Sequence, residues 1–350
     1  MCNKCPKAIS LDTLANACTE FVTACVSEPK ISLKNTTQYE DKKTLRKRAK
    51  RKYLSRGLST ALINYCEKNS EKAELLKSYR NTFHCAEELV EKDGKVTTEY
   101  CKNRWCLVCN AIRQAVLQNQ YSPVLENWEE KHFVTLTVPN CKGEDLKETI
   151  KEMCATFGRI NQMFYRRWKR GKGAKFVGLR KLECTYNPHR DDFHPHFHVI
   201  VDSKEMGEDL LNEWLSRNPT CDRKAQDIRQ ADENSSKELF KYFTKIITSK
   251  DKEKRIYVGA LNTIFRAIRG MKTFQPFGFK LSDFITEETE NEAIEEEEEE
   301  SNENTFPQFF SWDQEIADWV NKETGELLSG HILSESLQEI TKKKMILNSS

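Results

Sequence analysis

Three runs of apolar and threonine residues in the middle of the chain predict β-strands. They cover residues 132–138 (HFVTLTV), 175–187 (KFVGLRKLECTYN) and 196–202 (HFHVIVD). The first run stops at Pro139-Asn140, a pair typical of turns, and a turn-prone stretch separates the second run from the third. Because the last two runs are joined by a loop, we expect them to pair antiparallel.

Other segments carry apolar residues at every third or fourth position, which predicts amphipathic helices. In residues 146–169 these positions are Ile150, Met153, Phe157, Ile160 and Phe164. Residues 205–217 and 236–249 are also predicted to be helical, and residues 223–230 to form an edge strand. The resulting order of strand, helix, strand, strand, helix, strand and helix predicts an α+β fold.

Composition limits the class of protein. The chain has 350 residues, 38% of them hydrophobic and 31% charged, and no apolar run approaches the ~18 residues of a membrane-spanning helix. The first residues, MCNKCPKAIS, lack the apolar core of a secretory signal. We therefore expect the thirteen cysteines to lie in a reducing cytoplasm, where metal ligation is more common than disulfide formation.

Charge is distributed unevenly around the net value of +2. Residues 283–303 contain twelve acidic side chains and no basic one, which leaves 56 basic against 42 acidic residues in the rest of the chain. A basic remainder of this size suits a polyanionic partner. Self-repulsion within the acidic segment predicts that it is disordered.

These features divide the chain into five expected regions. Residues 1–80 form a helical, basic N-terminal region, and residues 81–125 form a cysteine-rich segment. Residues 126–280 hold the α+β domain, and residues 281–305 form the acidic linker. Residues 306–350 are expected to form two short helices, in WDQEIADWV and ESLQEITKKK.

Two basic clusters are candidates for contact with nucleic acid. The first, KKTLRKRAKRK, has eight Lys or Arg in eleven positions, and the second lies at the end of the helix 146–169. Each is either a solvated helix face or a surface that binds phosphates and releases their counterions. The candidate contacts are Lys42, Lys43, Arg46, Lys47, Arg48, Lys50, Arg51, Lys52, Arg166, Arg167, Lys169, Arg170 and Lys172.

A histidine pair is the strongest local signal of chemistry. Residues two apart on a strand point to the same face, so His196 and His198 present two imidazoles together. If strand 175–187 pairs beside them, Glu183, with Lys181 and Thr185 as its same-face neighbours, comes within reach of the same face. Two imidazoles and a carboxylate suit Mg²⁺ or Mn²⁺, although histidines that decorate an exposed strand remain the alternative.

A second constellation lies on the predicted helix 236–249. Glu238 and Tyr242 are four residues apart and Lys245 follows three later, so a carboxylate, a phenol and an ammonium share one face. A phenol is a poor nucleophile at its usual pKa of about 10, and a nearby cation would stabilise the phenolate. The same spacing is also common on helices whose role is only structural.

Taken in order, the motifs resemble those of the HUH endonucleases. HFVTLTVPN, Glu183 in RKLECTYN, HPHFHVIV and ELFKYFTK follow the layout of the single-tyrosine rolling-circle replication initiators of bacterial plasmids. The resemblance runs from about Cys101 to Lys245. It implies a central antiparallel sheet with helices on one side, and a host helicase as a partner.

The resemblance also implies a mechanism. His196, His198 and Glu183 would hold Mg²⁺ or Mn²⁺ against the scissile phosphate. Tyr242 would attack the phosphorus of the origin DNA, forming a 5′-phosphotyrosyl bond and freeing a 3′-hydroxyl primer. Glu238 matches the glutamate that single-tyrosine members carry four residues before the nucleophile, and we expect it to act as a general base.

The cysteine-rich segment extends the resemblance. Cys101, Cys106 and Cys109 form a C-x4-C-x2-C stretch like the one these initiators carry before their first motif. Thiolates at this spacing suit a tetrahedral Zn²⁺ site, with Cys85 as the fourth ligand and His84 as the alternative to it.

Three functions are compatible with these features. The favoured one is a plasmid replication initiator that nicks single-stranded or extruded origin DNA. An HUH relaxase or transposase is the first alternative, although relaxases generally place the tyrosine before the histidines. A zinc-ribbon DNA-binding regulator without catalysis is the second, and it would leave Glu183, the histidine pair and Tyr242 unexplained.

Overall fold

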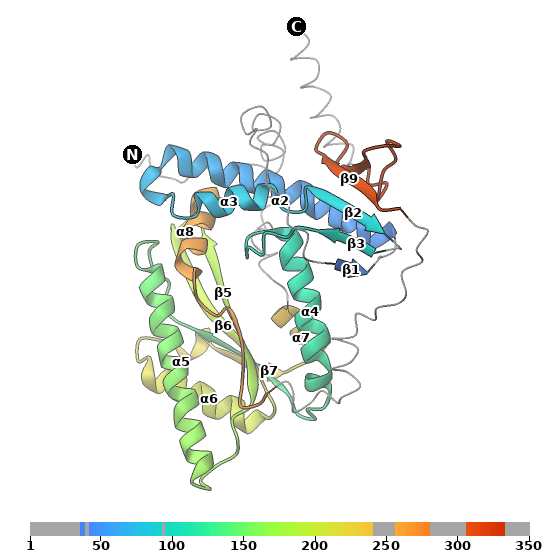
Figure 1. Ribbon diagram of the computed structural model, residues 1–350. Helices are drawn as coiled ribbons and strands as arrows, with labels where there is room; N and C mark the ends of the chain where they lie inside the picture. Colours follow the sequence, from blue (N-terminus) through green and yellow to red (C-terminus); the bar gives the residue numbers. More distant parts are fainter. Residues whose placement is uncertain (1–35, 39–41, 93–94, 241–255, 281–305, 333–350) are drawn as a thin grey trace. The chain divides into compact units, whose positions relative to one another are not determined.

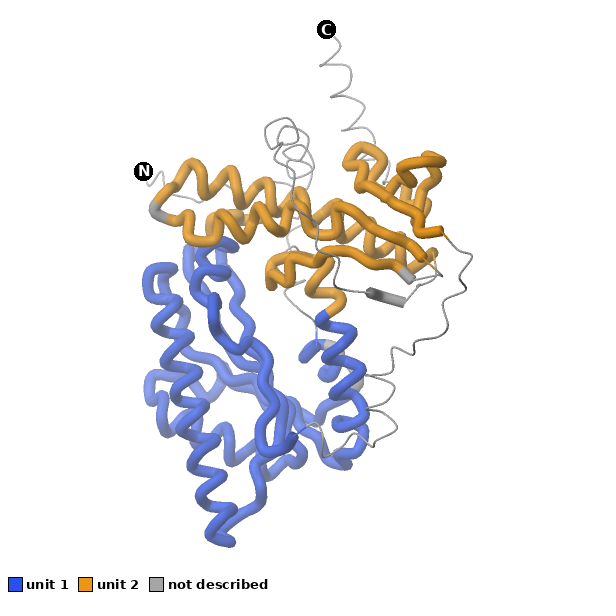
Figure 2. Tube along the Cα trace, viewed as in Figure 1, with its two compact units in different colours: residues 1–6, 113–246, 260–296 blue, residues 7–112, 247–259, 297–350 orange. Residues whose placement is uncertain are grey.

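The structure is a computed structural model in which two compact units are distinguished (Figure 2). Unit 1 consists of residues 1–6, 113–246 and 260–296, and unit 2 consists of residues 7–112, 247–259 and 297–350. Within these units the structure describes residues 36–38, 42–92, 95–240, 256–280 and 306–332. The acidic linker 281–305 and the predicted helix ESLQEITKKK lie outside the described residues.

Unit 1 is built on a five-stranded sheet. Its strand order is β7 (Asp227–Gln230), β4 (His132–Thr137), β6 (Asp192–Val201), β5 (Gly178–Asn187) and β8 (Phe274–Phe277). Every neighbouring pair is antiparallel. The predicted pairing of the second and third strands and the predicted edge position of β7 are therefore confirmed.

The strand that carries the histidine pair is longer than the sequence predicted. β6 begins at Asp192 and so includes Pro195, which leaves only residues 188–191 for the turn after β5. The last residue of β4, Thr137, lies opposite His196, so Pro195 lies beyond the end of β4. A proline cannot donate a ladder hydrogen bond, and at this position β4 offers no residue to accept one.

Two helices, α5 (Leu146–Lys169) and α6 (Lys204–Arg217), cover one face of this sheet (Figure 1). The ring of Phe197, on β6, lies 5.7 Å from the ring of Phe157 on α5 and 5.8 Å from that of Trp214 on α6. Because neighbouring residues of a strand point to opposite faces, these contacts leave the two histidines of β6 on the other face. The helices predicted over 146–169 and 205–217 are confirmed.

The other face of the sheet has an apolar half and a polar half. α7 (Glu233–Phe240) and the last turns of α4 (Leu107–Glu126) cover the apolar half. The buried residues of that layer are Tyr121, Val124, Leu125, Trp128, Phe133, Leu179, Ile200, Ala231, Leu239 and Phe240. The polar half lies farther along the same strands and carries the candidate site. The remaining helical elements near this sheet are η2 (Arg223–Ala225) and α8 (Val258–Ile268).

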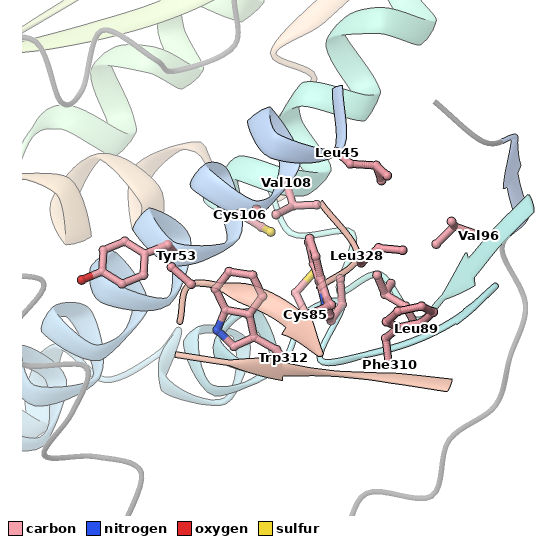
Figure 3. Close-up of a cluster of buried hydrophobic side chains, with 14 of the residues drawn as sticks. Leu45, Tyr53, Cys85, Leu89, Val96, Cys106, Val108, Phe310, Trp312 and Leu328 are labelled. Carbon is pink, nitrogen blue, oxygen red and sulfur yellow. The ribbon is translucent and has the colours of Figure 1, made fainter. Parts of the chain in front are cut away.

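Unit 2 combines helices with a second five-stranded antiparallel sheet. Its helical elements include α2 (Lys42–Lys68), η1 (Ser70–Lys72), α3 (Leu76–Phe83) and the first turns of α4. The strand order is β1 (Thr36–Gln38), β3 (Lys95–Thr98), β2 (Glu88–Lys92), β9 (Gln308–Asp313) and β10 (Asp318–Asn321). Figure 3 shows the core of this unit, where Leu45 and Tyr53 of α2 belong to the same buried cluster as Leu89 of β2 and Trp312 of β9.

The helix predicted in WDQEIADWV is wrong, because these residues form the end of β9, the turn and most of β10 in a β-hairpin. Phe310 and Trp312 alternate with more exposed neighbours along β9, which is the period of a strand rather than a helix. In the turn, the Asp313 carboxylate accepts hydrogen bonds from two backbone N–H groups, and Ala317 adopts a φ of 60°. β9 pairs with β2, more than 200 residues earlier, so local periodicity could not reveal this hairpin.

Among the described residues, no helix combines the length and the apolar character needed to cross a membrane.

Candidate functional site

The paired strands β5 and β6 bring a carboxylate and two imidazoles together. Glu183 lies directly opposite His196 in the register of the pair, and His198 lies two residues farther along β6. Nε2 of His196 and Nε2 of His198 are each 3.5 Å from Oε2 of Glu183. The predicted grouping of these three residues is therefore present in the structure.

The surroundings fix the orientation of both rings. Nδ1 of His196 is 3.1 Å from the backbone oxygen of His194, and Nδ1 of His198 is 3.4 Å from Oγ1 of Thr135 on β4. The His198 ring also packs against the ring of Phe133, with 5.0 Å between their centres. With Nδ1 engaged in this way, each imidazole turns Nε2 toward Glu183, as is usual for metal-binding histidines.

Burial and charge shift the titration of these groups. Burial alone would raise the pKa of Glu183, but its contacts with the two histidine rings and the charge of Lys181 outweigh that effect and hold the pKa well below its usual range. Burial lowers the pKa of His198. At neutral pH the site therefore offers an ionised carboxylate and, at His198, a neutral imidazole, which are the protonation states that metal ligands need.

The arrangement fits a divalent metal ion. Within the described part of the chain, Nε2 of His198 is buried and has no hydrogen-bond partner, and a buried polar atom without a partner is costly. The donor atoms of Glu183, His196 and His198 lie within 4.8 Å of one another. A metal ion that these three residues bind would satisfy that nitrogen and leave coordination positions open for substrate oxygens.

Two further charged residues surround Glu183. Nζ of Lys181, two residues earlier on β5, forms an ion pair with Oε1 of Glu183 and donates to the backbone oxygen of Glu238 at 2.9 Å. The Glu238 carboxylate, on α7, lies 4.0 Å from Nε2 of His198 and 3.6 Å from Nη2 of Arg229. The sequence placed Lys181 on the same face as Glu183, but it gave no sign of its link to α7.

The predicted catalytic residues are only partly described. Glu238 lies in α7, and its carboxylate is beside the His198 imidazole. Tyr242 and Lys245 lie outside the described residues, which end at Phe240 in this part of the chain.

Four cysteines form a second group in unit 2. Cys85, Cys101, Cys106 and Cys109 place their sulfur atoms within 4.8 Å of one another. Sγ of Cys109 is 3.5 Å from Sγ of Cys85 and 3.7 Å from Sγ of Cys101. These separations are too long for a disulfide bond of about 2.05 Å. They match the edge of about 3.8 Å that a tetrahedron with Zn–S bonds of about 2.3 Å requires.

The protein also supports the sulfur atoms from outside. Ser55 of α2 donates its hydroxyl to Sγ of Cys106 at 3.6 Å, and the backbone N–H of Cys101 donates to Sγ of Cys85 at 3.4 Å. Hydrogen bonds from the other three thiols lower the pKa of Cys106 well below that of an ordinary thiol. Of the two alternatives for the fourth ligand, Cys85 lies in the group, whereas His84 is not among its members.

The first basic cluster is divided between the surface and the interior. Lys42, Lys43, Arg46, Lys47 and Lys50 are exposed, and Arg51 is half-buried. Arg48 and Lys52 are only 6% and 1% exposed. They lie on the side of α2 that faces the core, so the prediction that these two residues contact DNA is wrong.

Lys52 has a structural role instead. Its ammonium donates to the backbone oxygens of Phe83 and Cys85 at 3.1 and 2.6 Å, and to Oε2 of Glu87 at 2.9 Å. Arg56, one turn later on α2, donates to the other oxygen of Glu87 at 2.7 Å. These contacts join α2 to the segment that carries Cys85, the first of the four clustered cysteines.

The second basic cluster is exposed throughout. It consists of Arg166, Arg167, Lys169, Arg170 and Lys172, at the end of α5 and just beyond it. Two aromatic residues, Tyr165 and Trp168, lie among these cations in the stretch YRRWKR. Tyr165 is 54% exposed, and Nζ of Lys169 lies 4.6 Å from the ring centre of Trp168. Cations interleaved with aromatic rings are typical of surfaces that bind single-stranded nucleic acid.

Comparisons with known proteins agree with these features. Residues 95–205 match the family described as "Replication protein". This stretch includes three of the four clustered cysteines and all three residues of the Glu183 group. No solved structure matches the chain at a significant level.

Several curated proteins named "Protein rep" are similar to the chain. The one from Staphylococcus aureus is 33% identical over 182 residues, which cover 46% of this chain and 75% of that protein. The one from Bacillus amyloliquefaciens is 32% identical over 148 residues, or 38% and 42% of the two chains. The one from Streptococcus pneumoniae is 33% identical over 109 residues, or 29% and 32%. The chain therefore belongs to the replication protein family, which confirms the resemblance to the Rep initiators of rolling-circle plasmids.

Proposed function

We propose that the protein is a metal-dependent, site-specific DNA endonuclease that nicks the origin of a plasmid and so starts rolling-circle replication. The observation that carries this proposal is the group formed by Glu183, His196 and His198 on one face of the sheet, with Glu238 beside it. A regulator that only binds DNA has no need of this group. Membership in the replication protein family supports the same function.

Glu183, His196 and His198 would hold Mg²⁺ or Mn²⁺. A carboxylate ligand favours such hard ions, and the bound ion would polarise the scissile phosphate and stabilise charge that develops on it. The protein contributes the orientation of the three ligands and their protonation states. Because Glu183 is ionised over the whole physiological range, the site is ready to bind a cation without first losing a proton.

Tyr242 is the proposed nucleophile. Its phenolic oxygen would attack phosphorus, the bond from phosphorus to the 3′-oxygen would break, and that oxygen would take up a proton to become the 3′-hydroxyl primer. The 5′-phosphate would remain on the tyrosine. Lys245 would stabilise the phenolate. Glu238 would act as general base for the water or 3′-hydroxyl that later releases the DNA.

The four cysteines are proposed to hold a structural Zn²⁺ ion. All four ligand positions of a tetrahedron would be filled by sulfur, and a closed site of this kind supports folding rather than catalysis. The cluster lies within the buried core of unit 2.

The exposed basic residues are proposed to contact the phosphate backbone of the origin. They are Lys42, Lys43, Arg46, Lys47, Lys50, Arg51, Arg166, Arg167, Lys169, Arg170 and Lys172. Origin DNA, single-stranded or duplex, is thus the partner, and a host helicase acts with the protein after nicking. We place this activity in the cytoplasm, where plasmid DNA and host replication proteins are found.

A nicking assay tests the proposal. Supercoiled DNA that carries the replicon's origin is incubated with Mn²⁺ and wild-type protein, and the yield of open circles is measured. Tyr242→Phe should give no open circles, because phenylalanine has no nucleophilic oxygen. If wild-type protein binds the origin but leaves it supercoiled, the chain is a DNA-binding regulator. An HUH relaxase or transposase would instead nick DNA that lacks a replication origin but carries a transfer or transposon end.

A further inference from the structure

We propose that Lys181 is a positioning residue that fastens the last described turn of α7 to the carboxylate of Glu183. This inference rests on the proposed function, because α7 carries Glu238 and leads in sequence to Tyr242. It assigns to a residue outside the proposed metal site the task of holding Glu238 beside that site.

The contacts of the Lys181 ammonium carry the inference. It forms an ion pair with Oε1 of Glu183, and it donates to the backbone oxygen of Glu238 at 2.9 Å. The other carboxylate oxygen, Oε2, faces Nε2 of both histidines at 3.5 Å. The carboxylate is thus divided, with one oxygen toward the lysine and the other toward the proposed metal position. A cation placed this way orients a metal ligand from behind.

The second contact reaches the backbone of α7, which is described as Glu233–Phe240. Lys181 donates from β5 to the Glu238 carbonyl, and Tyr242 follows four residues later in the sequence. The contact therefore holds the backbone of the residue whose carboxylate lies 4.0 Å from Nε2 of His198.

The burial of Lys181 argues against an incidental contact. The residue is only 5% exposed, and lysines are rarely buried unless their charge is paired. Both of its identified partners belong to the proposed catalytic machinery. The cost of burying this ammonium is therefore offset by contacts that tie a metal ligand to the helix of the proposed general base.

The inference predicts a particular kinetic pattern for Lys181→Met. Because the whole turn of α7 would lose its attachment, both nicking and release of the DNA should slow by about 10- to 100-fold, as expected when reacting groups are misplaced by about 1 Å. Glu238→Ala should slow release alone. Loss of the Lys181 ammonium removes a charge that repels a metal ion, which raises metal affinity, whereas loss of the orientation of Glu183 lowers it. Each variant is therefore compared at saturating Mn²⁺.

A second measurement does not depend on activity. In metal-free protein, hydrogen exchange of a peptide covering residues 233–240 should be faster in Lys181→Met than in wild type, because α7 has lost its hydrogen bond from Lys181. Lys181→Arg, which keeps a charged donor, should restore part of the protection and part of both rates. If Lys181→Met does not fold, Lys181→Gln, which keeps a neutral donor, is measured in its place.

Arg180→Met is the matched control. Arg180 is the neighbouring residue on β5 and is 3% exposed, but its guanidinium lies over the rings of Phe157 and Phe197 on the opposite face. This variant should melt at a lower temperature while exchange of residues 233–240 and both rates at saturating Mn²⁺ stay near wild type. Equal effects of Arg180→Met and Lys181→Met, or wild-type rates and exchange in Lys181→Met, would overturn the inference. A wild-type protein that never nicks would instead refute the proposed function. The hydrogen-exchange comparison would still test the contact between Lys181 and α7, because it does not depend on activity.

Discussion

Removal of the proposed zinc ion should unfold unit 2. Three of the four cysteines belong to its buried core, with Cys106 at 0%, Cys85 at 3% and Cys109 at 6% exposure, and Cys101 packs against that core. Structural zinc sites contribute apparent binding free energies of about 10–16 kcal/mol. A whole domain is stable by only about 5–15 kcal/mol. The metal therefore contributes as much as the entire margin of stability, and its loss should abolish the cooperative melting transition of this unit.

The assay combines metal analysis with melting curves. Freshly purified protein should contain one equivalent of zinc, and a strong zinc chelator should eliminate the near-ultraviolet circular dichroism of the buried Trp312 and Trp319, which are packed 4.8 Å apart in this unit. Cys106→Ser should have the same effect without chelator. Cys66→Ser is the matched control, because Cys66 is equally buried in unit 2 but belongs to no group of potential ligands among the described residues. Under half an equivalent of zinc, or equal melting of the two variants, would refute the reasoning.

Three further predictions follow from the described contacts. Lys52→Met should lower the free energy of unfolding, measured by urea titration, by about 3 kcal/mol. The reason is that Glu87 loses one of its two buried cationic partners and keeps only Arg56. A change below about 0.5 kcal/mol would be that of a surface residue. Glu238→Ala should still nick and should accumulate the covalent DNA adduct, with release slowed by about 100-fold on gels; wild-type release would remove Glu238 from the mechanism. Metal-free protein should lose stability as the pH falls below about 6.5, because burial lowers the pKa of His198 and the unfolded chain therefore takes up the proton first. His198→Gln should lose less stability over the same range. The same slope of stability against pH in both proteins would contradict the assignment of this effect to His198.

The grouping of Glu183, His196 and His198 could be predicted from the sequence because its geometry is local to two strands. A period of two residues places His196 and His198 on one face whatever the rest of the chain does. Glu183 required one further assumption, that its strand pairs beside them, and the register confirms this by placing Glu183 opposite His196. Lys181 was visible on the same face, but its bond to the Glu238 carbonyl depends on where α7 packs, which no pattern in the sequence specifies.

The rest depends on contacts between distant segments. The basic block at the start of α2 looked uniform in sequence, yet Arg48 and Lys52 lie on the inward side because the helix packs on a core built from β2 and β9. Lys52 finds its partners 31 to 35 residues away, where charge counts give no information. The β9–β10 hairpin was predicted as a helix for the same reason, since β2 supplies its partner.

The most direct test of the central claim is to locate the DNA on the protein. Wild-type protein is incubated with Mn²⁺ and origin DNA, the mixture is denatured and digested, and the peptide that carries a nucleotide is identified by mass spectrometry. The account predicts a 5′-phosphate linked to Tyr242, formed only with a divalent metal ion. It also predicts no adduct in Tyr242→Phe or His196→Ala, while binding of duplex origin remains nearly intact in both. An adduct on another residue, or one that forms equally in His196→Ala, would contradict it.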